Sequence, residues 1–413
     1  MFNAVLLYLI IFYIQPGSRI RSLGTLRIEL VIGGLLLLIL FAQRGTKIFR
    51  KTKLNKAIAL FFVSVCLSMG GALWTHTASH SIEVFIGMLK FFSIYIMIVA
   101  TVDSEKKLKK FMIVYLGCIF ILFTEPFLLS LQGMNFEYKQ GVSHLFGVGQ
   151  FAHYNSLGGI TASNLSFMIQ WFLFTKNILF KILLLLFSAI GIRVIILTGS
   201  RTAYVGALVL ALLAIFFGKY RIRNLIIVSV LGIIIYSFMP DQYRDRFISI
   251  KQSVDVVEGE KINDSMYTRW QIIKDAWGVF LKYPIVGCGL DSFYQLRGKI
   301  YGRWQQSHNL YLQILTNLGI FGMVAFLYLL RTLFQYIVYT KNRLIMVGRH
   351  KSFTWHVLIG CQMFIIMRLA VGMFGHDLFE NYWWLISGIV MACYSIVEKQ
   401  SADSEERTGL VTE

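Results

Sequence analysis

Long apolar stretches separated by short polar connections run through the whole of the 413-residue chain. Most of them are long enough for a helix to cross about 30 Å of hydrocarbon. The pattern predicts about twelve transmembrane helices, of which the first is the shortest. They fall near residues 1–15, 27–43, 56–74, 81–102, 109–131, 151–175, 179–198, 202–218, 223–239, 309–339, 354–374 and 381–397.

The composition supports a membrane protein over a soluble one. The chain is 56% hydrophobic and 15% charged, with a mean hydropathy of +0.64, which is too apolar for a soluble domain of this length. We therefore expect an all-α polytopic membrane protein with one large loop on its non-cytoplasmic side, and this loop contains an amphipathic helix. Its parts are N-terminal helices over 1–239, the loop over 240–308, C-terminal helices over 309–397 and a cytoplasmic tail over 398–413.

The net charge of +19 is divided among the connections, so we expect no nucleic-acid partner. Lys and Arg concentrate in alternate connections, as in cytoplasmic loops. The basic connections are 44–56, 106–110, 176–181, 219–223 and 341–351, and those poor in cations are 75–80, 132–150, 199–202 and 375–380. Both termini are thus predicted to be cytoplasmic. Only Arg19, Arg21 and Arg27, in the segment 18–27, break the rule, which a re-entrant or misplaced first helix would explain.

The loop 240–308 is much longer than the other connections, and long loops in compact proteins usually carry function. Within it, residues 266–282 read as a helix, with N-cap candidates Asn263, Asp264 and Ser265 before it and Pro284 after it. Its apolar stripe predicts a helix that lies on the outer leaflet. The stripe consists of Met266, Trp270, Ile273, Trp277, Phe280 and Leu281.

Three polar side chains are expected on the same outer face. Arg269 lies at the edge of the apolar stripe, Arg201 lies in the tight turn between two spans, and His308 precedes the next apolar helix. An Arg near the hydrocarbon boundary can hold phosphate oxygens with two parallel hydrogen bonds, and His can act as a general base. The alternatives are that both arginines only anchor helix ends and that the histidine is an interfacial residue.

Further polar residues surround these three. Asn309 and Gln313, with Thr316, form a polar stripe on the helix that follows His308, and such a stripe normally faces a cavity or another helix. Arg303 lies in the long loop ahead of His308. Two further arginines are candidates: Arg193 and Arg368 would either be anion ligands or pair with Asp377 and Glu380.

Motifs for metal and nucleotide chemistry are absent from the sequence. There is no G-x-x-x-x-G-K-[ST], no H-E-x-x-H and no G-x-S-x-G. The five cysteines stand singly, so neither a disulfide framework nor a zinc spacing is expected. These observations favour a metal-independent reaction without a cofactor, and a carboxylate-assisted route through Asp291, Asp377 or Glu380 stays open.

The ordered set of motifs resembles the O-antigen ligase and polymerase superfamily, membrane glycosyltransferases that build bacterial surface polysaccharides. The resemblance covers about 195–325. It rests on Gly199-Ser200-Arg201-Thr202, Arg269-Trp270, Pro284-x-x-Gly287-x-Gly289, Ser307-His308-Asn309-x-x-Leu312 and Leu318-Gly319-x-x-Gly322. The chain departs from the family pattern at Asp291 and over 151–165, where only Asn155 matches.

The resemblance implies a donor, an acceptor and a site. The donor would be a glycan linked through diphosphate to undecaprenol, and the acceptor a sugar hydroxyl of lipid A-core or of a growing polysaccharide. Arg201 and Arg269 would bind the diphosphate, and His308 would accept the acceptor's proton. The protein would act at the periplasmic face of the bacterial inner membrane, surrounded by membrane lipids.

Two questions stay open at the level of sequence. Ligation and polymerisation would use the same residues, so the sequence does not separate them. A polysaccharide flippase or another secondary transporter is the alternative function, although such carriers tend to have two similar halves with midplane charges and broken helices. No second copy of the long loop occurs in the first half of the chain.

Overall fold

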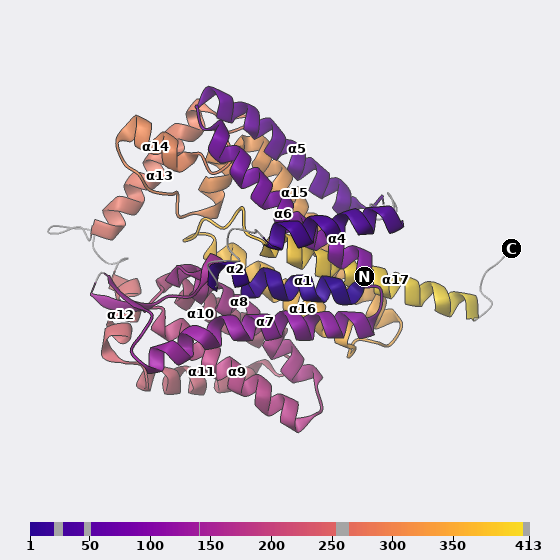
Figure 1. Ribbon diagram of the computed structural model, residues 1–413. Helices are drawn as coiled ribbons and strands as arrows, with labels where there is room; N and C mark the ends of the chain where they lie inside the picture. The colour runs from indigo at the N-terminus through magenta and orange to yellow at the C-terminus, as the bar shows by residue number, and fades with distance from the viewer. Residues whose placement is uncertain (20–27, 45–50, 140, 253–263, 408–413) are drawn as a thin grey trace.

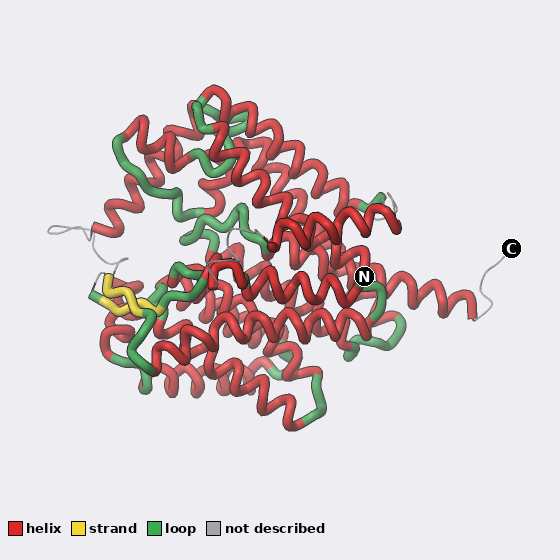
Figure 2. The backbone as a smooth tube through the Cα atoms, viewed as in Figure 1, coloured by secondary structure: helices red, strands yellow, loops and turns green. Residues whose placement is uncertain are grey.

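The computed structural model describes residues 1–19, 28–44, 51–139, 141–252 and 264–407. Arg21, Arg27, Asn263, residues 253–262 of the long loop and residues 408–413 of the tail lie outside this range. The described chain is helical apart from one small hairpin (Figure 2). Before the hairpin, the helices are α1 (Phe2–Ile14), α2 (Pro16–Arg19), α4 (Ile28–Arg44), α5 (Lys53–Trp74), α6 (Ala78–Thr101) and α7 (Glu105–Leu131).

The antiparallel hairpin of β1 (Phe136–Lys139) and β2 (Val142–Leu145) lies in the predicted 132–150 connection and was not predicted. The 3₁₀ turn η2 (Gly149–Phe151) follows it. The later helices are α8 (Tyr154–Phe174), α9 (Ile178–Leu197), α10 (Arg201–Phe217), α11 (Arg221–Ser237), α12 (Asp241–Gln252), α13 (Asp264–Lys282), α14 (Phe293–Tyr301), α15 (Leu310–Met346), α16 (Phe353–Val371) and α17 (Tyr382–Arg407).

An all-α membrane protein is confirmed at this level of detail. In the described part of the chain, six helices are long and apolar enough to cross a membrane: α5, α6, α7, α9, α15 and α16. Two shorter apolar helices, Ile28–Gln43 and Arg201–Phe217, accompany them. The count of about twelve spans therefore stays a prediction, as does the assignment of the long loop to the periplasm.

The N-terminus and the end of α17 lie at one end of the bundle, and the hairpin, α12, α13 and α14 lie at the other (Figure 1). We call this second end the loop end; among the described residues it comprises 75–77, 132–139, 141–153, 198–200, 238–252, 264–309 and 372–381. Arg19, which breaks the charge rule, lies in an ion pair with Glu125 near the end of α7. A partner of opposite charge thus neutralises this arginine on the side where cations are otherwise scarce.

Helix α8 lies between several other helices, and small residues on it let these neighbours approach closely. It packs against α9, α10 and α16. A Cβ at Gly158 would come 2.7 Å from the Ala203 side chain of α10, and one at Gly159 would come 3.1 Å from Arg368 of α16. These two glycines therefore bring the loop-end parts of α8, α10 and α16 together.

Helix α15 is broken at Gly319, whose φ of 67° and ψ of −167° are not helical. The turn over 284–289 fills the break. Pro284 and Ile285 accept hydrogen bonds from the amides of Ile320 (2.8 Å) and Phe321 (3.2 Å), while the amides of Cys288 and Gly289 donate to the carbonyls of Thr316 (2.9 Å) and Asn317 (3.3 Å). Backbone groups that the break frees are thus paired by this turn.

The motif Pro284-x-x-Gly287-x-Gly289 forms the turn over 284–289, which we call the glycine turn, and its backbone approaches that of α15 closely. Gly287 has a φ of 78°, and a Cβ there would lie 2.2 Å from the carbonyl oxygen of Asn317. Gly289 has a φ of 113°. His308 precedes α15, as expected, and the helix is interrupted at Gly319.

The helix predicted over 266–282 is confirmed as α13, but its buried face differs from the predicted one. Ile272, Ala276 and Val279 pack against α14 and the glycine turn. The predicted stripe is largely exposed, at Trp270, Ile273, Trp277 and Leu281. Arg269 is also exposed rather than partly covered. The helix thus has two apolar faces, and the exposed one carries both tryptophans, as expected at a lipid surface.

Candidate active site at the loop end

His308 stands immediately ahead of α15 in a left-handed backbone conformation, with φ of 45°. Asn309 caps the helix: its Oδ1 accepts hydrogen bonds from the amides of Tyr311 (2.9 Å) and Leu312 (3.0 Å). A short polar side chain suits the N-cap because it satisfies donors that the first helical turn leaves unpaired. The cap fixes where the helix begins and therefore where the imidazole emerges.

The segment around His308 is held against the 372–381 loop. The Leu310 amide donates to the Gly372 carbonyl (2.7 Å), and the Asn309 side-chain amide donates to Met373 (3.1 Å). Gln313 is buried and accepts a hydrogen bond from the Leu378 amide (3.0 Å). The predicted polar stripe thus faces another segment of the chain, and it positions this loop.

The loop places His376 beside His308, with ring centroids 5.1 Å apart in an edge-to-face arrangement. Arg269 approaches from α13, where its guanidinium carbon lies 5.9 Å from the centroid of Phe374 of the same loop. Residues from the long loop and from the connection between α16 and α17 therefore meet at His308, although they are far apart in the sequence.

The environment lowers the pKa of His308 to about 4. The His308 side chain keeps contact with solvent, and its partial desolvation by the surrounding protein is the main cause of the lowered pKa. His376, Arg269, His153 and Arg297 lower the pKa further because positive charge nearby disfavours the imidazolium. His308 is therefore neutral at neutral pH and able to accept a proton.

Arg201 begins α10, as the sequence predicted, and is half-buried. Ser200 caps the helix by accepting from the Ala203 amide (3.2 Å) and donates its hydroxyl hydrogen to Asn155 of α8 (2.6 Å). His153, which caps α8, lies on the preceding turn and acts electrostatically on His308. The start of α10 is thereby tied to the start of α8 at the loop end.

Of the two further candidate arginines, Arg193 and Arg368, the second forms an ion pair. Its Nη1 lies 3.3 Å from Oδ2 of Asp377, and its guanidinium carbon lies 4.2 Å from the centroid of Tyr382. Arg193 instead lies near Tyr243 of α12, on which it acts electrostatically. Arg368 is therefore the partner of an acid, one of the two roles that the sequence allowed.

Glu380 is the second carboxylate of this loop. Burial, first, and repulsion from Asp377 raise its pKa to about 7, against the opposing effect of Arg368. The carboxylate thus titrates near neutrality, so a proton can be bound or released here at ordinary pH. This keeps a carboxylate-assisted route chemically available near the histidines.

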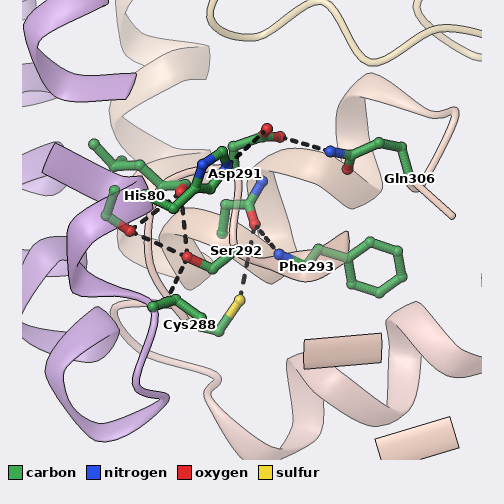
Figure 3. Close-up of polar contacts among 10 residues, drawn as sticks. His80, Cys288, Asp291, Ser292, Phe293 and Gln306 are labelled. Atoms are coloured by element: carbon green, nitrogen blue, oxygen red, sulfur yellow. Dashed lines mark hydrogen bonds and ion pairs between the residues drawn. The ribbon is translucent and has the colours of Figure 1, made fainter. Parts of the chain in front are cut away.

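Asp291 holds the segment that leads into His308 (Figure 3). Its carboxylate accepts a hydrogen bond from the Gln306 side chain (3.1 Å) and pairs with Nε2 of His80 on α6 (3.3 Å). Next to it, the Ser292 hydroxyl accepts from Thr77 (2.7 Å). The departure from the family pattern at Asp291 therefore has a structural role, because it links α6 to the residues just before His308.

Arg303 contacts α13 rather than the histidines. Its guanidinium donates to Gln271 (3.1 Å) and lies 3.4 Å from Asp275. Asp275 is buried and also pairs with the fully buried Arg297 through a 2.8 Å hydrogen bond. The sequence pointed to Arg303 but not to the Asp275–Arg297 pair, since the two residues are 22 positions apart and no local pattern joins them.

His153 and His376 were also missed, although a signal for them exists. Of the eight histidines in the chain, six lie in the predicted outer connections or at their borders, at positions 76, 80, 144, 153, 308 and 376. Charge alternation alone would have placed these on one side of the membrane. Two of the six have structural contacts: His144 bonds the carbonyls of Thr198 and Lys139, and His80 pairs with Asp291.

No group of three or more His, Cys, Asp or Glu residues with metal-binding geometry occurs in the described part of the chain. The five cysteines are free thiols there, and four of them are buried. Cys288 lies in the glycine turn, where burial raises its pKa to about 12. The four buried cysteines are therefore packing residues.

Comparison with protein families identifies the fold that carries these residues. Residues 182–327, about a third of the chain, match the O-antigen ligase family. Over these residues the chain carries an O-antigen ligase domain, which supports the O-antigen ligase and polymerase superfamily. The match spans Arg201, Arg269, the glycine turn and His308, so the resemblance seen in the sequence motifs is confirmed. A search of curated proteins finds no significant match.

The matched region ends in the middle of α15 and leaves out two elements that complete the site. These are the start of α8 with His153 and the 372–381 loop with His376 and Asp377. Both contact the matched region directly, through the Ser200–Asn155 and Leu310–Gly372 hydrogen bonds. The surroundings of His308 therefore depend on parts of the chain outside the matched region.

Proposed function

We propose that this superfamily member is a metal-independent glycosyltransferase of the ligase or polymerase type. It would move a glycan from undecaprenyl diphosphate to a sugar hydroxyl, of lipid A-core or of a growing polysaccharide, at the periplasmic face of the inner membrane. The observation that carries the proposal is a neutral, solvent-accessible His308 with Arg269 beside it. Such a pair suits a reaction that deprotonates a hydroxyl and releases an anion.

In the proposed reaction, the acceptor hydroxyl oxygen attacks the anomeric carbon of the donor while its proton passes to His308. The bond from that carbon to the diphosphate oxygen breaks, and undecaprenyl diphosphate leaves with the electron pair, so the configuration inverts. Arg269 and Arg201 would stabilise the charge that develops on the leaving group. No metal takes part in these steps.

The electrostatics of the site also give the donor a role in activating the base. The cations around His308 hold its pKa low in the free protein. A bound diphosphate would offset their charge and raise the pKa toward neutrality, where a general base is most effective. Donor binding would thus strengthen His308 as a base when the substrate is present.

The carrier alternative draws some support from the break in α15, because broken helices line transport sites. In a carrier, however, the backbone groups at the break are available to substrate or ions. Here the turn over 284–289 occupies them, through the hydrogen bonds to Thr316, Asn317, Ile320 and Phe321. We therefore favour transfer chemistry at the loop end.

Complementation tests the proposal in cells. Strains that lack the native gene would receive wild type, His308→Ala, Arg201→Ala or Arg269→Ala, and surface polysaccharide would be profiled on gels with membrane expression checked in parallel. We expect each expressed variant to lose the wild-type pattern and to accumulate lipid-linked glycan. Accumulated single repeats would indicate a polymerase, and accumulated long chains a ligase. Full restoration by all three variants would exclude this site.

A further inference from the structure

A pocket of about 330 Å³ opens beside the proposed site, between α13, α14 and the segment that leads to His308. We call it the Trp304 pocket; it is lined by Thr268, Gln271, Arg297, Arg303, Trp304 and Gln305. Its volume is at the lower end of the range of about 300–1,000 Å³ for ligand pockets. It therefore suits a single small unit of a larger substrate.

The charges at this pocket leave a positive surplus. Arg297 is fully buried; its Nε donates to Asp275 (2.8 Å) and its Nη1 to Gln305 (3.0 Å), whereas its Nη2 has no hydrogen-bond partner among the described residues. Arg303 shares the same aspartate at 3.4 Å. Two guanidinium groups thus face one carboxylate, and a buried donor without a partner is costly. An anionic ligand group at the exposed Arg303 would offset this surplus of positive charge.

Trp304 gives the pocket a flat apolar wall. A Cβ at Gly298 would come 2.4 Å from the indole, so the ring lies directly over the backbone of α14 at a position where only glycine fits. The indole is 54% exposed. An aromatic face fixed in this way, with the amides of Gln271 and Gln305 beside it, has the combination of apolar wall and planar hydrogen-bonding groups that suits a pyranose ring.

The pocket lies close to the proposed reaction centre. Thr268 lines it, while the next residue of α13, Arg269, extends over Phe374 near His308. Trp304 and His308 are four residues apart on an irregular segment, which spans at most about 14 Å. One oligosaccharide can therefore occupy the pocket and present a hydroxyl or an anomeric carbon at the histidine.

From these contacts we propose that the Trp304 pocket binds an acidic sugar unit, a hexuronic acid residue, of the glycan substrate. The carboxylate would pair with the exposed Arg303, next to the buried charge of Arg297, and the ring would stack on Trp304. This inference rests on the proposed transferase function and adds the chemical class of the sugar that the protein selects.

Binding to the full-length protein in lipid nanodiscs tests this inference. The probes are tetragalacturonate and its carboxyl-reduced counterpart, measured by isothermal titration calorimetry. We expect saturable binding of the acidic probe. The reduced probe should bind at least about tenfold more weakly, as for loss of one charge-assisted contact. Trp304→Ala and Arg303→Gln should each weaken binding of the acidic probe by about tenfold.

Matched control variants are available on the same face of the protein. Trp277→Ala removes another exposed tryptophan of the long loop, and Arg244→Gln removes a partly exposed arginine that pairs with Asp241. Both should bind the acidic probe as wild type does. Equal affinity for the two probes, wild-type affinity in Trp304→Ala and Arg303→Gln, or no saturable binding would each overturn the assignment.

The same experiment separates this inference from the proposed function. His308→Ala should keep the affinity for tetragalacturonate, because the histidine does not line the pocket, while losing glycan transfer. If transfer fails in His308→Ala but Trp304→Ala binds normally, the pocket assignment alone is wrong. If Trp304→Ala loses binding but His308→Ala still transfers, the transferase site alone is wrong.

Discussion

At the scale of single residues, the site depends on which positive groups surround one imidazole. His308 lies within the electrostatic reach of Arg269, Arg297, His153 and His376, so the neutral form is favoured. No single neighbour creates this state, because desolvation contributes most and the cations add to it. The residue can therefore be tested by changing its neighbours as well as by removing it.

The pH dependence of transfer should report this environment. Since His308 must be neutral to accept a proton, kcat/KM is expected to fall as the pH decreases through the free-protein pKa of about 4. Arg269→Gln removes a cation that lowers this pKa, so the acidic limb should move to higher pH. The profile of kcat/KM for Arg244→Gln should match wild type, and an unshifted limb in Arg269→Gln would contradict the assignment.

The cap at Asn309 is a second residue-level test. Asn309→Ala removes the acceptor for the Tyr311 and Leu312 amides and should lower the free energy of unfolding by about 1 kcal/mol. Asn309→Asp keeps the cap but loses the hydrogen bond to Met373. Thermal unfolding in detergent should therefore separate the variants. Equal midpoints for Asn309→Ala and wild type would show that the cap does not fix the start of α15.

At the scale of elements, sequence patterns predicted helices that follow from a local apolar periodicity. They did not predict features that depend on contacts between distant segments. The spans and α13 follow from apolar periodicity, and the glycine turn from its composition. The break in α15 did not follow, because Gly319 reads as one small residue of an apolar helix until the turn over 284–289 is placed in it. The buried face of α13 was misassigned since two of its faces are apolar.

The turn in the broken helix can be tested by adding one methyl group. Gly287→Ala would place a Cβ 2.2 Å from the Asn317 carbonyl oxygen at a positive φ, a clash added to backbone strain of about 1–3 kcal/mol. We expect a clear decrease in the thermal unfolding midpoint. Gly70→Ala on α5 has open space around it and should leave the midpoint unchanged or raised. Equal midpoints for both variants would contradict the described packing.

At the scale of the whole molecule, the charge pattern and the fold agree on which groups share a side. The basic connections between α8 and α9, between α10 and α11 and between α15 and α16 lie towards the end that holds the N-terminus and the end of α17, and the hairpin, α12, α13 and α14 lie at the other (Figure 1). The sequence could predict this arrangement because orientation follows from where Lys and Arg fall. It could not predict that the 372–381 loop completes the site, since that depends on hydrogen bonds between α15 and a loop over 60 residues later.

Orientation itself is open to direct measurement. In a variant with Cys66, an exposed thiol, replaced by alanine, single cysteines would be introduced at Met373 and Glu137 of the loop end and at Lys219 and Arg349 of the opposite end. A membrane-impermeant maleimide should label the first two in intact spheroplasts and the last two only after permeabilisation. The reverse pattern would place the proposed site in the cytoplasm.

The most direct test of the transferase account is a reconstituted reaction with purified protein and a defined undecaprenyl diphosphate-linked glycan. Single-turnover transfer to an acceptor saccharide would be measured for wild type and His308→Ala, together with donor binding. We predict that His308→Ala slows transfer by at least about 100-fold and leaves donor affinity within about twofold, because Arg201 and Arg269 remain. Wild-type transfer rates in His308→Ala would contradict the role of His308 as the base.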